Sequence, residues 1–297
     1  MIGGCSRTPT APTPTDVAVT QAIIKDITGN AKGARDEART LFSQSEALLA
    51  AGNYNGAMDK RLEMLSIRGQ DPSTFGALTA YAIQQMAFSD LENVASHLDA
   101  PSCRKYAGQL TALDAKMPTH VAMLQADKAR ILQQLATRSR DPKIWKAMIA
   151  DLGDTPRQQQ ALNKMPVSQI KGYIEKFYNA RVNWALKPYS TKWVKIRVDP
   201  YTRLVIGDTS SDRFLWTDRK TERLLTIVAL QQRADELEKK KRAWPLPTDP
   251  FGSGPLKEKA VLVYSVGPDA KDDGGKSVPN PKSVQDTDKG DIPAPTF

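Results

Sequence analysis

The residues best suited to chemistry lie near the C-terminus, where aspartates and glycines follow a short apolar segment. Val261 to Val266 is apolar and predicts a strand, and the loop after it is acidic and rich in glycine. Six aspartates belong to this region: Asp269, Asp272, Asp273, Asp286, Asp288 and Asp291. Calcium takes about six to eight oxygen ligands, which carboxylates and exposed backbone carbonyls of a loop can supply. The residue types are compatible with a calcium-binding loop and equally with a solvated turn-forming loop, because Asp and Gly also favour turns.

The spacing of these aspartates does not match an EF-hand. Lys271 stands where that loop needs an oxygen ligand, and Asn280 stands where it needs the bidentate glutamate. We therefore exclude an EF-hand at this position.

A second chemistry would use Cys103 as a nucleophile, with His97 or His120 as its base. Such a nucleophile needs a base within hydrogen-bond reach and a third group that orients the base. His97 precedes Cys103 closely, across the break at Pro101, but no nucleophile elbow, phosphate-binding loop or metal pair accompanies them. We predict that the chain is not an enzyme and has no catalytic residue. A cysteine-dependent hydrolase remains the alternative, and a small buried thiol is the simpler interpretation of Cys103.

Composition bounds the class of protein. The chain has 297 residues, of which 40% are apolar and 25% charged, which is ordinary for a globular protein with a substantial core. The 42 Lys and Arg against 33 Asp and Glu give a net charge of +9, which favours acidic partners. The cations are dispersed and form no basic face interleaved with aromatics, so we expect no nucleic acid partner. No apolar run reaches the roughly 18 residues of a membrane span, so we expect no transmembrane helix.

Residues 16–186 are predicted to form a helical domain. Apolar residues recur at helical spacing from Asp16, a possible N-cap, to about Leu186, and prolines mark the breaks between successive segments. The pattern predicts roughly five to seven helices joined by short turns, as in a helical bundle or a hairpin array.

One turn in this domain has a more specific pattern. Gly52-Asn53-Tyr54, with Ala57 three residues later, resembles the turn of a tetratricopeptide repeat. Gly52 would permit the helix reversal, and Tyr54 and Ala57 would pack between the helices. Only one copy is visible, so a generic helical hairpin is the simpler interpretation. A repeat scaffold that binds a peptide or a secretion partner remains the alternative.

Residues 187–219 are predicted to be an irregular connection, with Trp193 to Val198 as an edge strand. A helix follows, with Leu224 to Leu237 on its apolar face and Lys239 to Arg242 at its end. Four cations suit the negative end of a helix dipole. A membrane or nucleic-acid patch is the less economical interpretation of this short run.

The segments after this helix come in a recognisable order. Trp244-Pro245, Asp249-Pro250-Phe251-Gly252, the strand, Asp273-Gly274-Gly275 and Asp291-Ile292 follow one another. This order, over about 220–292, resembles the C-terminal half of the type II secretion major pseudopilin. The whole chain is also similar to extracytoplasmic bacterial helical proteins that end in this module.

The resemblance implies a small α+β domain over 220–297, with a long helix, short strands and a calcium-binding loop. Asp269, Asp272, Asp273 and Asp291 match the acidic part of the family motif, and Asp286 and Asp288 are additional candidates.

Two departures qualify this implication. The family's Gly-Gly-x-Gly run is reduced to Gly274-Gly275, and Lys276 to Gln285 is an insertion, which alters the ligand set. The helix Leu224 to Leu237 is amphipathic and internal, so the module is not expected to polymerise.

Residues 1–15 alternate proline and threonine and predict a disordered tether. Within it, Ile2-Gly3-Gly4-Cys5 resembles the lipobox of bacterial lipoproteins, which implies a lipid anchor on Cys5. The basic and apolar regions of a signal peptide are not found before Cys5. Either such a segment is encoded upstream, or Met1 is the true start and Cys5 is an ordinary thiol of a cytoplasmic protein.

Taken together, the sequence predicts a mainly α protein: a helical bundle or hairpin array followed by a small α+β pseudopilin-like C-terminal domain. The predicted function is that of a non-enzymatic, extracytoplasmic lipoprotein of the cell envelope. Its helical domain would bind an envelope or secretion protein, and its C-terminal module would bind calcium.

Overall fold

The computed structural model describes residues 14–67, 74–146, 155–156, 160, 163–190, 212–281 and 284–297. Side chains are described from residue 32 onward, except those of residues 74–75. Three predictions lie outside the described residues: the lipidated Cys5, residues 1–13 of the tether, and the edge strand Trp193 to Val198.

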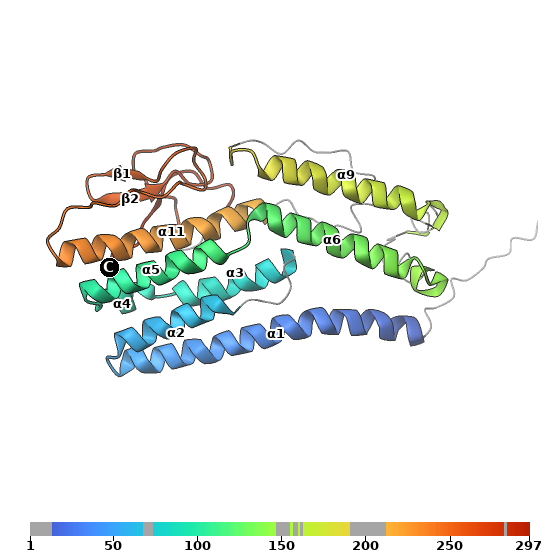
Figure 1. Ribbon diagram of the computed structural model, residues 1–297, viewed down its shortest axis with the longest axis horizontal. Coiled ribbons are helices and arrows are strands. Elements are labelled where there is room, and N and C mark those ends of the chain that lie inside the picture. The colour runs from blue at the N-terminus through green and yellow to red at the C-terminus, as the bar shows by residue number, and fades with distance from the viewer. Residues whose placement is uncertain are drawn as a thin grey trace, which may run out of the picture.

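The described chain is mainly helical (Figure 1). Its helices are α1 (Pro14–Ala50), α2 (Tyr54–Ser66), α3 (Thr74–Phe88), α4 (Leu91–Ala95), α5 (Ala100–Lys116), α6 (His120–Arg138), α9 (Val167–Ala185) and α11 (Asp212–Leu237). Within this part of the chain, no helix combines the length and the apolarity needed to cross a membrane.

Two element boundaries differ from the predicted ones. Helix α1 begins at Pro14, inside the segment predicted as a tether, because proline at the first helical position has a suitable φ and loses no bonded N–H. Helix α11 begins at Asp212, so the last residues of the segment 187–219, predicted as irregular, are helical.

The turn between α1 and α2 has the predicted geometry. Gly52 has a φ of 73°, a conformation that glycine adopts without strain, and the Asn53 side chain accepts a hydrogen bond from the Gly56 amide at 2.9 Å. Ala57 is fully buried, and the half-buried ring of Tyr54 stacks on His97, with 4.2 Å between the centroids. These contacts fix α1 and α2 as an antiparallel hairpin.

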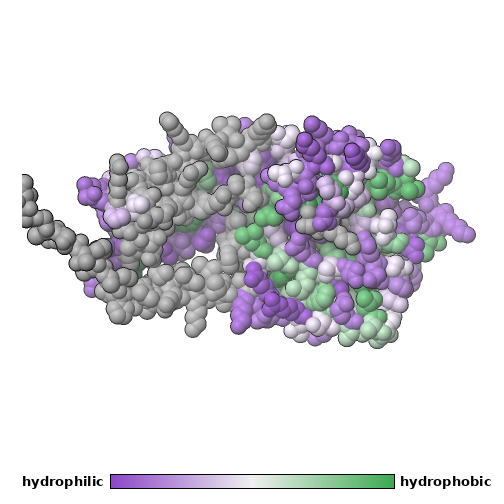
Figure 2. Space-filling view, turned by 180° about the vertical axis from the view of Figure 1, so that it is seen from behind, coloured by the Kyte–Doolittle hydropathy of each residue, from purple (hydrophilic) through white to green (hydrophobic). Residues whose placement is uncertain are grey.

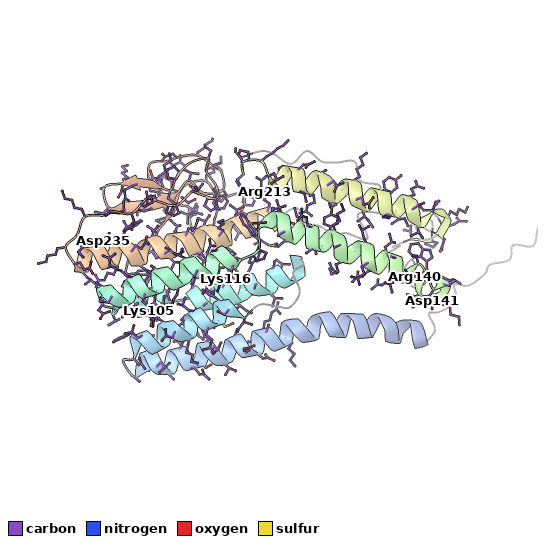
Figure 3. The ribbon with its side chains drawn as sticks, in the orientation of Figure 1. Lys105, Lys116, Arg140, Asp141, Arg213 and Asp235 are labelled. Carbon is purple, nitrogen blue, oxygen red and sulfur yellow. The ribbon has the colours of Figure 1, made fainter. Side chains whose placement is uncertain are left out.

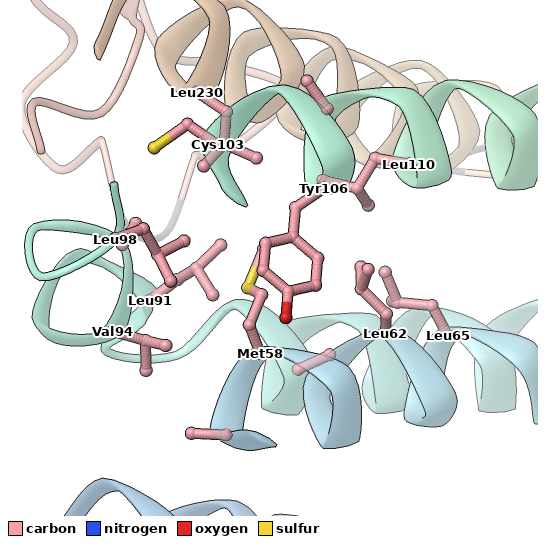
Figure 4. Close-up of a cluster of buried hydrophobic side chains, with 14 of the residues drawn as sticks. Met58, Leu62, Leu65, Leu91, Val94, Leu98, Cys103, Tyr106, Leu110 and Leu230 are labelled. Carbon is pink, nitrogen blue, oxygen red and sulfur yellow. The ribbon is translucent and has the colours of Figure 1, made fainter. Parts of the chain in front are cut away.

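The largest core lies between the helices of the hairpin and those that follow. Helix α3 packs on α1 and α2, and α5 packs on α2 and α11. Figure 4 shows Tyr106, Met58 and Leu230 among the buried side chains of this core. The Tyr106 hydroxyl donates to the Asn55 carbonyl at 2.8 Å, which satisfies the polar atom of the buried ring.

Helix α11 belongs to two cores at once. One face places Ile227, Leu230 and Ala234 against the other helices. The opposite face places Leu225 and Val228 against the C-terminal segment. The predicted C-terminal domain therefore shares its only long helix with the helical layer.

The C-terminal segment forms a small antiparallel sheet over α11, with strand order β1-β2-β3 (Figure 1). The strands are β1 (Lys257–Lys259), β2 (Leu262–Ser265) and β3 (Ile292–Pro293). Val263 and Ile292 point into the core beneath the sheet. The predicted apolar strand is thus present as β2, and Val261 lies in the preceding turn. The prediction of a mainly α protein with a small C-terminal sheet is confirmed, and the likeness of that segment to a pseudopilin module stays a prediction.

Helices α6 and α9 form a pair with a third core between them, at the end of the molecule away from the sheet (Figure 1). Leu124 and Ile174 are fully buried at the centre of this pair.

Candidate functional site

The acidic loop is organised around Asp291, whose side chain is completely buried. Its Oδ2 accepts a hydrogen bond from the Gly275 amide at 2.7 Å, and its Oδ1 accepts one from the Asp273 amide at 3.3 Å. Burial raises the pKa of Asp291, the two amide bonds lower it, and the charges of Asp272 and Asp273 raise it further. Asp291 therefore closes the loop and lies in the field of two other carboxylates.

Asp272 is held by the neighbouring strand and by its own turn. Its Oδ1 accepts hydrogen bonds from the Tyr264 hydroxyl at 2.9 Å and from the Gly274 amide at 3.0 Å. The amide bond is the main reason that the pKa of Asp272 lies below its usual range. Burial, together with the Asp272 bond, raises the pKa of Tyr264 to about 12.

Asp273 contributes its amide to the bond with Asp291, and the residue itself is exposed. The remaining three predicted ligands have separate partners. Their partners are the Lys271 amide for Asp269 at 3.2 Å, the Tyr189 hydroxyl for Asp286 at 2.7 Å, and the Gln285 amide for Asp288 at 2.8 Å. Across the described part of the chain, no three His, Cys, Asp or Glu side chains are grouped so as to hold a metal ion. The six aspartates are thus distributed along the loop, and only Asp272, Asp273 and Asp291 act on one another.

A further aspartate, Asp249, was not among the predicted ligands, and yet its side chain accepts three hydrogen bonds, more than that of Asp291 or Asp272. Its Oδ1 accepts hydrogen bonds from the Ser265 hydroxyl at 2.7 Å and the Phe251 amide at 3.0 Å, and its Oδ2 accepts one from the Val266 amide at 2.8 Å. The side chain ties the Asp-Pro-Phe-Gly turn to the end of β2. An aspartate that precedes a proline turn is the sequence signal for this arrangement.

The loop closes where two glycines meet. Gly267 has a φ of 70°, and a Cβ there would lie 2.2 Å from the Gly290 carbonyl oxygen. Only glycine fits this approach, which brings the end of β2 against the start of β3.

The cysteine and histidines of the hydrolase alternative have different surroundings. The thiol of Cys103 is buried in the main core, and burial raises its pKa. His97 makes a 2.9 Å hydrogen bond through Nδ1 with the Asn93 carbonyl, and His120 lies on α6. Among the described residues no hydrogen bond joins Cys103 to either ring. This arrangement does not favour an activated thiolate.

His120 belongs to a buried polar cluster at the junction of α6, α9 and α11. Its Nε2 lies 3.5 Å from Asp212 Oδ2, which also binds Arg181, and all three side chains are buried. The ring of His120 stacks on Trp216, whose Nε1 donates to the Pro118 carbonyl at 3.1 Å. This cluster was not predicted, because its members are separated along the chain.

An open pocket of about 350 Å³ lies between α2 and α5. The apolar part of its lining comes from Leu62, Ala112 and Leu113, and the polar part from Asp59, Glu63, Ser66, Gln109 and Lys116. Figure 3 shows Lys116, which lines the pocket, and Lys105, which lies nearer the start of α5. The pocket was not predicted, because it depends on how α5 packs against the α1–α2 hairpin.

Comparison of the chain with protein-family models, with curated proteins and with solved structures finds no match. Its function is therefore inferred from its own residues.

Proposed function

We propose that this chain is a non-catalytic interaction protein of the bacterial cell envelope, in which the helical layer binds a partner protein and the C-terminal segment acts as a stabilising cap. Asp249 and Asp291 are held by internal hydrogen bonds, and burial raises the pKa of the Cys103 thiol. The observation that carries the proposal is the pocket between α2 and α5.

The pocket has the character of a protein-binding site. Leu62 and Leu113 offer an apolar floor for one side chain of a partner, and the charged rim surrounds it. The rim acids Glu63 and Asp59 form ion pairs at the surface, with Lys60 at 2.7 Å and with Lys105 at 3.1 Å. Such pairs contribute at most about 1 kcal/mol, so a partner can exchange them at little cost.

The test is photo-crosslinking from the pocket in envelope extract. A benzophenone amino acid at Ser66, an exposed residue of the lining, should form one defined adduct, which mass spectrometry identifies. Ala112→Trp should abolish the adduct, because the indole fills the pocket from an exposed position on α5.

Ala115→Trp is the matched control, since Ala115 is exposed on the same helix outside the pocket. It should leave the adduct unchanged. An adduct that survives Ala112→Trp, or no adduct at all, contradicts the proposal.

A second candidate function, calcium binding by the C-terminal loop, is supported by the charge arrangement at Asp291. Asp272 and Asp273 both raise the pKa of this buried carboxyl, so the three charges repel one another. A divalent cation would relieve the repulsion. Each Asp291 oxygen accepts one amide bond, and a carboxylate oxygen has a second lone pair for a cation.

Thermal unfolding tests the calcium site. Calcium that binds only the folded chain stabilises it by about 2.7 kcal/mol at a hundred times the dissociation constant, which raises Tm. Asp272→Ala with Asp273→Ala should remove the rise, and Asp286→Ala with Asp288→Ala is the control that should keep it. Identical melting temperatures in millimolar calcium and in chelator count against the site.

A lipid anchor at Cys5 is supported by the lipobox-like Ile2-Gly3-Gly4-Cys5 and the Pro/Thr segment that follows. Incorporation of labelled fatty acid in cells, abolished by Cys5→Ser, tests the anchor. A chain that fractionates with the cytoplasm without label supports the alternative location instead.

A further inference from the structure

One end of the molecule carries a group of lysines around exposed apolar side chains. We call it the basic end surface and define it by residues from the end of α11 and from the β1–β2 hairpin: Leu237, Lys239, Lys240, Lys241, Lys257, Lys259 and Val261. Val261 is 83% exposed and Leu237 is 43% exposed, and together with Leu78 and Leu186 they are the largely exposed large apolar residues in the described part of the chain. Figure 2 shows hydrophilic residues that protrude at this end of the molecule, with hydrophobic ones among them.

Hydrogen bonds hold the two parts of this surface together. Arg242 binds Glu258 through both of its terminal nitrogens, at 3.0 and 2.7 Å, so the lysine run is fixed beside β1. Gln232 donates from Nε2 to the Val261 carbonyl at 3.1 Å, which fixes the hairpin tip against α11. The surface is therefore a preformed arrangement of residues that are distant in sequence.

The nearby acids are largely neutralised within the chain. Glu238 binds Arg104 and Lys240, and its hydrogen bond to Arg104 is the main reason that its pKa is lowered to about 2. Glu258 is engaged by Arg242. Glu236 is the acid that remains exposed on the last turn of α11. On the β1 side, the exposed Asp272 lies in the field of Lys257 and Lys259, and Lys259 Nζ donates to the Gly274 carbonyl at 2.9 Å. The positive field of this end therefore comes mainly from the lysines that follow α11.

Two backbone positions favour a functional reason for these residue types. Lys239 ends α11 with a φ of 53°, and its amide and that of Lys240 close a Schellman turn on the carbonyls of Glu236 and Asp235. Glycine is the usual residue at such a position, because a side chain is strained there. The sequence has a lysine instead.

The tip of the β1–β2 hairpin also has a residue other than glycine at a positive φ. Ala260 has a φ of 56°, and the two-residue turn that joins β1 to β2 is Ala260-Val261. Two-residue hairpin turns favour Gly, which adopts a positive φ without strain, and the polar residues Asn and Asp. An apolar pair at an exposed tip leaves Val261 free to enter an apolar medium.

We propose that the basic end surface binds anionic lipid bilayers, with Val261 entering the interface and the lysines contacting headgroup phosphates. Lysines near an anionic membrane each strengthen binding about fivefold, and their long stems let the ammonium groups reach the headgroups beside an inserted apolar residue. A nucleic acid would match the charge, but it offers no apolar medium for Val261.

Vesicle co-sedimentation tests the proposal with the full chain carrying Cys5→Ser, so that no acyl chain contributes. Vesicles of phosphatidylcholine with phosphatidylglycerol should bind the chain, and pure phosphatidylcholine vesicles should not. Binding should weaken at high salt, because screening shortens the range of the lysine charges. Lys239→Gly with Lys241→Gln should weaken binding at least tenfold.

Matched controls separate binding from folding. Lys239→Gly should raise the melting temperature while it lowers binding, because it relieves the strained φ. Val261→Ser should weaken binding several-fold, whereas Leu186→Ser, which alters a residue 70% exposed at the end of α9, should not. Lys143→Gln with Lys146→Gln is the charge control, since both lysines are exposed on another part of the chain.

Three outcomes overturn the proposal. The first is the absence of binding to anionic vesicles. The second is a loss of binding in Lys143→Gln with Lys146→Gln that equals the loss in Lys239→Gly with Lys241→Gln, which would show that only net charge matters. The third is equally tight binding to duplex DNA that Val261→Ser leaves unchanged, which would make a nucleic acid the partner.

Discussion

Asp218, on α11, is a buried carboxyl whose pKa lies well above its usual range. It is 7% exposed and lies 3.1 Å from Arg219, and burial raises its pKa from 3.8 to about 6. The fold therefore binds this proton more tightly than the unfolded chain does. Its contribution favours folding below about pH 4 and is lost as the pH rises to about 6.

Asp218→Asn should therefore stabilise the protein at pH 7.5 by on the order of 1–3 kcal/mol, because the upward shift of about two pKa units, which already includes the pair with Arg219, measures what the charged carboxylate costs the fold. The gain should vanish near pH 4, where the parent carboxyl is already protonated in the fold. Urea unfolding at both pH values measures it, with the exposed Glu236→Gln as the control. A variant less stable than the parent at pH 7.5 would show that the ion pair outweighs burial.

The role of a single residue was predictable from the sequence where the local backbone conformation restricts which residue types fit. Gly52 and Ala57 were assigned their roles correctly, because a tight helix reversal needs a positive φ and a small packed side chain. The roles of the aspartates in the acidic loop were not predictable in this way. Whether an aspartate faces a cation or caps a turn depends on where its oxygens point, and residue type does not determine that.

The helices were mostly found at their predicted positions, since caps and prolines mark their ends. Asp99 caps α5 by accepting from the Ser102 amide at 2.9 Å, and α9 begins directly after Pro166. The start of α11 was missed. Its first turns are rich in charged residues that the fold buries, such as Arg213 and Asp218, and a hydrophobic pattern does not register them.

One buried guanidinium joins three of these helices. Arg61 on α2 is 1% exposed, and its Nε donates to Ser45 Oγ on α1 at 2.8 Å. Its Nη1 donates at 2.9 Å to the carbonyls of Met86 and Ser89, at the C-terminal end of α3. Carbonyls at a helix end lack the full set of intrahelical partners, so Arg61 adds a cap from another helix, beside the local bond from the Ser89 hydroxyl to the Met86 carbonyl.

Arg61→Lys should destabilise the protein by about 2–3 kcal/mol, because a single ammonium cannot replace the planar fork, and buried carbonyls lose their donors. Lys60→Gln, at the adjacent and half-exposed position, should change stability by less than about 0.5 kcal/mol. Chemical denaturation of the two variants provides the measurement. Equal small effects would mean that water replaces the lost donors.

At the scale of the whole molecule, the shared helix α11 determines how the parts depend on one another. Gln84 on α3 donates at 2.8 Å to the Arg219 carbonyl and accepts at 2.7 Å from Arg223. Arg223 also binds Asp114 on α5 at 2.8 Å. These partners are far apart in sequence, so no local pattern predicts them, and the division into a helical domain and a separate C-terminal domain gave no indication of the connection.

Leu230→Ala should therefore destabilise the sheet as well as the helices. The side chain is fully buried in the main core, and its truncation should cost about 2–5 kcal/mol. Hydrogen exchange should show protection falling by the same factor in residues 54–66 and 257–266. Leu186→Ala, at a largely exposed site, is the control. Protection lost in only one region would indicate two independent units.

The order of the helices, in which α11 follows the others of the main core, also affects how the protein folds during synthesis. The faces of α3 and α5 that bury Ile227, Leu230 and Ala234 have nothing to cover them until the ribosome has made residues beyond Leu237. Nascent domains usually fold from the N-terminus as they emerge. Here the main core can close only after most of the chain has emerged, so stalled or truncated products should expose an apolar surface and depend on chaperones.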